Sequence, residues 1–129
     1  MTKDEHIRYW ADEAERSWQD SKVLYKSKRN VFTLFSWHLA IEKLLKGVWV
    51  LNNESNFPPK IHNLTRIAIE CNVTLTDKRR EEFEVMNLWQ LEGRYPEYHK
   101  ELHKIATKNT WMRISKWLKT SENGYKRKC

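Results

Sequence analysis

The chain has 129 residues, 40% hydrophobic and 32% charged, which is typical of one soluble domain with a single core. Its three Gly and three Pro are too few for the many hairpins of an all-β fold. No apolar run reaches the roughly 18 residues that a membrane span needs. The net charge of +7 comes entirely from residues 94–129, which carry ten Lys or Arg and three Asp or Glu. This basic segment either attracts phosphate backbones or forms a solvated face.

The first two predicted helices contain most of the apolar residues. In residues 4–28, one amphipathic stripe is predicted to face the core; it consists of Ile7, Trp10, Ala14, Trp18, Ser21 and Leu24. Residues 31–52 are apolar on more than one face, so this helix is predicted to be central; its apolar residues include Phe32, Phe35, Leu39, Ile41, Leu44 and Leu45. Glu42 and Lys46 are expected to pair on its polar side.

Three further helical segments follow Pro58-Pro59, which prevents continuation of the second helix. Residues 61–71 form a third helix, and Thr76 is predicted to be the N-cap of a fourth that contains Leu88 and ends near Gly93. The last helical stretch spans about 98–120, with an interruption near Lys108. We therefore expect an all-α, up-and-down antiparallel bundle of four to five helices over residues 1–121, followed by a disordered basic tail over 122–129.

The N-terminal segment and the cysteines indicate a reducing compartment. Residues 1–6 are charged and contain no apolar signal stretch. Cys71 and Cys129 form no metal or redox motif. We predict a cytoplasmic protein without a membrane contact, a bound metal or a cofactor.

Four sequence motifs, in order along the chain, resemble those of the HEPN family, named for higher eukaryotes and prokaryotes, nucleotide-binding. Residues 36–46, SWHLAIEKLLK, resemble the signature of its second helix. Residues 58–64, PPKIHNL, resemble the entry to its third helix, and residues 93–98, GRYPEY, resemble the run after the next helix. Residues 116–118, KWL, match its closing aromatic helix.

The resemblance implies a helical bundle that commonly forms homodimers. It also implies an association with a separately encoded small nucleotidyltransferase, as in a toxin–antitoxin-type pair. The chain is not itself that transferase, because its four Asp are too scattered to form a paired-Asp metal site. Family members include RNA-cleaving toxins, inactive relatives, and modules that bind nucleotides or RNA, and a fold does not choose among them.

Arg94 and His99 are the candidate catalytic residues, because their spacing resembles the Arg-x(4–6)-His motif of ribonuclease members. An Arg fork can hold two phosphate oxygens, and a His can move the proton of a ribose hydroxyl without a metal. Tyr95-Pro96 departs from the continuous helix of those enzymes, since Pro96 lacks a backbone donor and restricts Tyr95. The alternative interpretation is that Arg94 and Tyr95 hold a loop on the bundle while His99 is exposed.

The candidate nucleotide- or RNA-binding residues are Arg94, Tyr95, Tyr98, His38 and His62. A polar site that joins the two histidines to Arg94 is one hypothesis. In the structural alternative, both histidines have a structural role, and His62 caps or satisfies the third helix.

Trp111 fits either a core position or a stacking platform, and its helical spacing favours the core. The sequence therefore leaves three hypotheses. The first is a dimeric HEPN-like module that binds a nucleotide, RNA or a partner nucleotidyltransferase. The others are a metal-independent ribonuclease toxin that uses Arg94 and His99, and a purely structural dimer.

Overall fold

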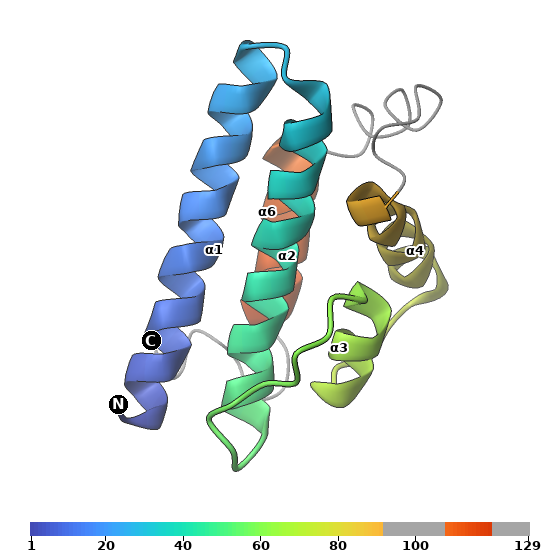
Figure 1. The fold of residues 1–129 in the computed structure, drawn as a ribbon. Coiled ribbons are helices and arrows are strands. Elements are labelled where there is room, and N and C mark those ends of the chain that lie inside the picture. Colours follow the sequence, from blue (N-terminus) through green and yellow to red (C-terminus); the bar gives the residue numbers. More distant parts are fainter. Residues whose placement is uncertain (92–107, 120–129) are drawn as a thin grey trace.

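The two longest helices form an antiparallel hairpin on which the other helices pack (Figure 1). The computed structural model describes residues 1–91 and 108–119. Helix α1 spans Lys3–Lys26 and helix α2 spans Asn30–Asn52, within about two residues of the predicted bounds. The tight turn between them places Lys28 in the left-handed region, at φ 59°. This turn lets α2 run back along α1 with only three residues between the two helices.

The open end of the hairpin, where α1 begins and α2 ends, is fixed by polar contacts. At the start of α1, the Thr2 hydroxyl accepts from the Glu5 amide at 3.2 Å, and the Glu5 carboxylate accepts from the Thr2 amide at 3.2 Å. This reciprocal capping box satisfies two otherwise unpaired backbone donors. Lys3 Nζ then donates to the carbonyl oxygens of Val50 and Asn53 at 2.8 and 2.7 Å. A cation is favourable there, because helix α2 ends with unpaired carbonyl groups.

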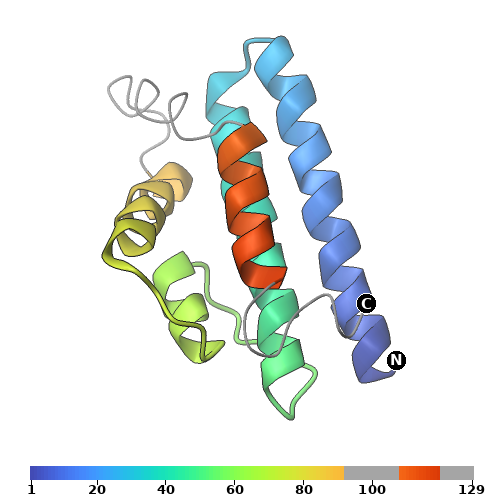
Figure 2. The same ribbon diagram turned by 180° about the vertical axis from the view of Figure 1, so that it is seen from behind.

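The remaining described helices pack on two sides of α2. Helix α3 spans Leu64–Glu70 and helix α4 spans Asp77–Leu91. Thr76 caps α4 as predicted, because its hydroxyl accepts from the Arg79 amide at 3.1 Å. Helix α6 spans Lys108–Lys119 and lies behind the hairpin, as the reverse view shows (Figure 2). The protein is thus an all-α helical bundle with α2 at its centre.

Four tryptophans connect these layers through the core. Trp37 on α2 lies between Trp18 of α1 and Trp89 of α4, with ring centroids 6.2 and 5.4 Å away. Trp111 of α6 stacks on Trp18 at 4.9 Å, with the two rings 1° from parallel. Large aromatic rings contribute much buried area each, so this chain of rings ties four helices to one core. The prediction that Trp111 belongs to the core is confirmed.

Some residues predicted to be buried are exposed. Phe32 and Phe35 are 63% and 44% exposed, and Leu88 of α4 is also exposed. Helix α2 is apolar almost all round, but the described helices cover only part of its first turns. The periodicity therefore identified the helix correctly and assigned too many of its faces to the core. The predicted tail, residues 122–129, lies outside the described part of the chain, as does the helical stretch before Lys108.

Within residues 1–91 and 108–119, no helix combines the length and the apolar character that a membrane crossing requires.

Candidate functional site

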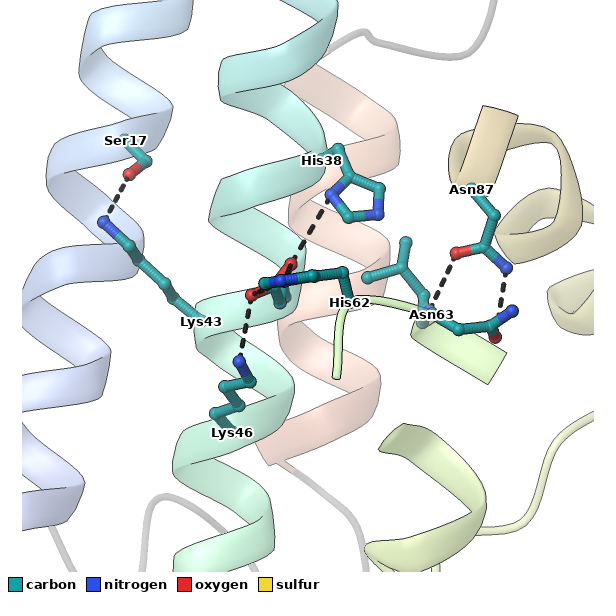
Figure 3. Close-up of polar contacts among 9 residues, drawn as sticks. Ser17, His38, Lys43, Lys46, His62, Asn63 and Asn87 are labelled. Atoms are coloured by element: carbon teal, nitrogen blue, oxygen red, sulfur yellow. Dashed lines mark hydrogen bonds and ion pairs between the residues drawn. The ribbon is translucent and has the colours of Figure 1, made fainter. Parts of the chain in front are cut away.

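A buried carboxylate on α2 is the centre of a polar cluster. Glu42 is only 4% exposed, although a charged side chain is rarely buried without partners. Lys46 Nζ donates to its Oε2 at 3.0 Å, one helical turn further along α2. His62 Nδ1 lies 3.1 and 3.2 Å from the two carboxylate oxygens, and His38 Nδ1 is 3.7 Å from Oε1. Figure 3 shows His38, Lys46 and His62 around this point of α2. We call these four residues the Glu42 cluster.

The pair formed by Glu42 and Lys46 differs from its predicted environment. The pair was predicted on the polar side of the helix, but Lys46 is also buried and its ammonium group lies 5.8 Å from the centre of the Trp10 ring. The prediction that Glu42 and Lys46 form an i,i+4 pair is therefore confirmed, but the prediction that the pair lies on the polar side of the helix is wrong. Buried charges that lose a partner destabilise a fold far more than surface charges do, so this pair constrains the cluster.

His62 presents an imidazole to solvent while the buried carboxylate holds one of its nitrogens. Its side chain is 63% exposed and belongs to the loop that precedes α3. An ionised carboxylate can only accept hydrogen bonds, so Nδ1 carries the proton that bonds Glu42. Nε2 is then the nitrogen that, in the neutral ring, can accept a proton from another molecule. The two contacts with the carboxylate therefore orient the exposed ring.

Asparagines position the loop that carries His62. Asn63, not His62, is the N-cap of α3, because its Oδ1 accepts from the Arg66 amide at 3.1 Å. The side chain that caps α3 is therefore Asn63, and His62 bonds Glu42 instead. Asn87 of α4 accepts from the Leu64 amide at 2.8 Å and donates to Asn63 Oδ1 at 3.2 Å. These bonds connect the loop to α4 as well as to α2.

His38 is buried beside the cluster and is neutral at pH 7. Burial disfavours the imidazolium and lowers the pKa of His38 from 6.5 to about 4, against the opposing charge of Glu42. His62 lowers this pKa further, while the His62 backbone and the Asn87 side chain act to raise it. Neither ring nitrogen of His38 meets hydrogen-bond geometry with a described residue. A structural role for His38, which is buried, stays a prediction.

The segment that carries His62 also exposes aromatic and basic side chains. Phe57 is 75% exposed, and Lys60 and Arg66 are exposed on either side of His62 in the sequence. No acidic residue occurs between positions 57 and 66. We call this stretch the 57–66 segment. It combines an exposed ring, two cations and a histidine within ten residues.

Comparison with protein families assigns the chain. A HEPN domain model matches residues 7–123, which is most of the sequence. The chain belongs to the HEPN domain family. Neither the curated proteins nor the solved structures that were compared gave a match.

The family match confirms the resemblance stated from the sequence, but it does not test the predicted catalytic pair of this HEPN domain. Arg94, Tyr95, Tyr98 and His99 all lie between residues 92 and 107, outside the described residues. The site that the structure does describe in this HEPN domain joins only His38 and His62 of the predicted residues.

Sequence reasoning missed Glu42 as the group that connects the two histidines. One signal was available, because Glu42 is the only acidic residue in the 23-residue, mostly apolar α2 of this HEPN domain. A single acidic residue in such a helix lies either on the exposed face or in the interior with a partner. The packing of the α2–α3 loop on α2 decides between these two cases, and this packing cannot be read from the local sequence.

Among residues 1–91 and 108–119, no group of three or more His, Cys, Asp or Glu is arranged to hold a metal ion.

Proposed function

We propose that this HEPN domain binds single-stranded RNA or a nucleotide at the surface formed by its α2–α3 loop. The observation that carries the proposal is the exposure of Phe57, Lys60, His62 and Arg66 within one segment, with His62 fixed by Glu42. Exposed rings stack on bases, and cations contact phosphates without reading the sequence. HEPN domains are commonly associated with nucleases and toxins, which fits an RNA ligand.

The basic C-terminal region supports the same ligand class. Residues 94–129 supply the whole net charge of +7, and helix α6 within them carries four Lys or Arg and no acid. Trp111 anchors α6 to the hairpin, so its exposed Arg113 and Lys116 form part of the folded domain. A positive surface raises the local concentration of a polyanion and speeds its association. We propose that Arg94, Tyr95 and Tyr98 add contacts to the same ligand.

The test is a binding titration with a labelled single-stranded RNA whose 2′-hydroxyls are replaced by hydrogen, so that nothing can be cleaved. The variant Lys60→Gln/Arg66→Gln removes two cations from the 57–66 segment. We expect its affinity to fall about tenfold at moderate salt. The matched control is Lys22→Gln/Lys26→Gln, two exposed cations on α1, which should bind like the wild type. Equal losses in both variants would show that only total charge matters and would reject the site.

A second candidate function, self-association, is favoured by an exposed apolar surface at the turn between α1 and α2. Val23 and Tyr25 near the end of α1 and Val31, Phe32 and Phe35 at the start of α2 are all exposed. Patches of this kind mark protein contacts, and HEPN domains often function as dimers. We infer that a second copy of this chain covers the patch.

Light scattering of wild type against Phe32→Ser/Phe35→Ser tests this inference. We expect a dimer for the wild type and a folded monomer for the variant. A monomeric wild type would reject the homodimer and leave the patch for the separately encoded nucleotidyltransferase of a toxin–antitoxin-type pair.

A further inference from the structure

We propose that the first turns of α1 and the exposed Phe57 ring form a subsite for unpaired nucleic-acid bases; this rests on the proposed function. The subsite consists of His6, Tyr9 and Phe57. Two of these rings belong to α1, which begins beside the end of α2 and the loop that follows it (Figure 1). The subsite therefore extends the RNA surface from the 57–66 segment onto a second element, and it makes that surface selective for single strands.

Phe57 extends into solvent from a backbone that is anchored by hydrogen bonds. The residue is 75% exposed, and its amide donates to Ser55 Oγ at 3.0 Å. The Ser55 carbonyl in turn accepts from Lys3 Nζ at 3.3 Å, so the start of α1 holds this part of the loop. A side chain that is already positioned in the free protein loses less conformational entropy when a ligand binds. Phe57 is thus a preorganised contact for an aromatic ligand.

The His6 ring contacts Phe57 and gives the subsite a second wall. The two ring centroids are 5.5 Å apart and the ring planes are 74° from parallel, which is a favourable edge-to-face arrangement of aromatic rings. The two planes therefore form a corner. A base that stacks on the open part of the Phe57 ring has its edge beside His6.

Tyr9 extends the subsite along α1. It follows His6 by three positions, so the two side chains lie on the same side of the helix. Tyr9 is 49% exposed, and its ring packs edge-to-face on Trp10 with the centroids 5.4 Å apart. The Lys46 ammonium lies 5.8 Å from the centre of the Trp10 ring, so the aromatic residues of α1 adjoin the Glu42 cluster.

These rings distinguish unpaired bases from paired ones. Every base has an aromatic face, so stacking on a protein ring requires no particular sequence. In a duplex, neighbouring bases cover these faces, whereas a base in a single strand can turn out and stack on a side chain. Lys60 and Arg66 are cations of the kind that contact phosphates, which both kinds of strand possess. The rings of the subsite therefore determine the preference for single strands.

The experiment compares two oligonucleotides of equal charge. One is the single-stranded 2′-deoxy oligonucleotide, and the other has the same sugar–phosphate chain without bases. Each is titrated with the full chain at the same salt concentration. We expect the wild type to bind the strand that contains bases about tenfold or more tightly than the abasic strand. In Phe57→Ser, the affinity for the strand with bases should fall about tenfold, while the affinities for the abasic strand and for a duplex stay unchanged.

Variants on α1 test whether this helix belongs to the subsite. His6→Ala and Tyr9→Ser should each weaken binding of the strand with bases by about threefold and leave binding of the abasic strand unchanged. The matched control is Ile69→Ser, which removes a 52% exposed apolar side chain from α3. This control should bind both strands like the wild type.

Lys3 is a positioning residue, and the two strands separate its charge from its effect on the loop. In Lys3→Met, loss of the charge weakens binding of both strands alike, whereas loss of the Ser55 anchor lowers only the difference between them. We expect this difference to fall about threefold or more in Lys3→Met and to be retained in Lys3→Arg, which keeps a donor and a charge. An unchanged difference in Lys3→Met would limit this lysine to a structural role.

The outcomes separate the subsite from the proposed function. A wild type that binds both strands equally, or Phe57→Ser that keeps the full preference for bases, overturns the subsite and leaves phosphate binding at the 57–66 segment standing. Equal losses in Phe57→Ser and Ile69→Ser overturn it as well, because exposed apolar area and not a ring would then be responsible. A wild type that binds neither strand rejects the proposed function, and the subsite with it.

Discussion

Removal of the charge on Glu42 should leave a buried cation without its partner. In Glu42→Gln, the Lys46 ammonium remains in a position where the residue is only 7% exposed. The only other described contact of this group is the Trp10 ring, with its centroid 5.8 Å away. A ring face stabilises a desolvated cation by about 2 kcal/mol or less, which does not replace a carboxylate at 3.0 Å. The single substitution is therefore expected to be strongly destabilising.

The magnitude follows from what each variant leaves unpaired. Breaking a buried ion pair from one side destabilises by about 3–5 kcal/mol, and Trp10 places Glu42→Gln near the lower value, about 3 kcal/mol. In Lys46→Met, the carboxylate keeps His62 as a partner, so we expect about 2 kcal/mol. In the double variant no charge is left unpaired, and the loss should be about 1 kcal/mol or less. The double variant is thus expected to be more stable than Glu42→Gln alone.

Urea unfolding followed by circular dichroism at pH 7 measures the three free energies of unfolding. A control variant, Arg16→Gln, removes a partner from an exposed pair with Glu13 and should change stability by less than about 0.5 kcal/mol. If the two single losses instead add in the double variant to within about 0.5 kcal/mol, Glu42 and Lys46 do not interact and the reasoning about the cluster is wrong.

Three further predictions concern other parts of the bundle. The pKa of His38 is lower in the folded protein, about 4, than in the unfolded chain, so acid favours unfolding between pH 6.5 and 4. When the pH falls from 7 to 4.5, the free energy of unfolding measured with urea should fall by about 2–3 kcal/mol less in His38→Gln than in the wild type. Equal falls in the two proteins would contradict the lowered pKa of His38. Trp111→Ala should cost about 3–5 kcal/mol by deleting the ring that stacks on Trp18, whereas Trp111→Phe should cost less, as thermal unfolding would show. Lys28→Gly should stabilise by about 0.5–1 kcal/mol because Lys28 has φ 59°, whereas Lys22→Gly inside α1 should destabilise; the same sign for both would reject the turn geometry.

The helices could be predicted from the sequence because their signals are local. Thr76 has the side chain that caps a helix, and the apolar stripe of residues 4–28 repeats with helical spacing. Helix α2 ends at Asn52, at the start of the run of residues 52–56 that was predicted to end it, and Pro58-Pro59 prevents the helix from continuing. These features depend on neighbouring residues only, which is why the predicted bounds of α1 and α2 are within about two residues of the observed ones.

Burial was harder to predict because it depends on which helices cover which face. Phe32 and Phe35 belong to an apolar helix, yet the described helices leave the first turns of α2 open on one side. Glu42 and Lys46 have the spacing of an ordinary surface pair, yet they lie inside the protein. Neither outcome follows from periodicity, since both are set by the packing of distant segments.

In the candidate site, too, the individual residues could be predicted from the sequence, whereas the contacts between them could not. His38 and His62 could be selected as polar residues of interest, but their connection through Glu42 requires the loop before α3 to pack on α2. Asn63 was part of the PPKIHNL motif at the entry to the third helix, but neither that motif nor Asn87, inside α4, indicated the hydrogen bond that joins the two residues. Long-range hydrogen bonds of this kind appear only once the fold is known.

The salt dependence of RNA binding tests the central claim most directly. For single-stranded nucleic acid, each phosphate contact contributes about −0.7 to the slope of log K against log salt concentration. We predict that the slope for Lys60→Gln/Arg66→Gln is less steep than that of the wild type by about 1.4, while Lys22→Gln/Lys26→Gln keeps the wild-type slope. Identical slopes for all three proteins, or a wild type whose binding does not respond to salt, would contradict an RNA site at the 57–66 segment.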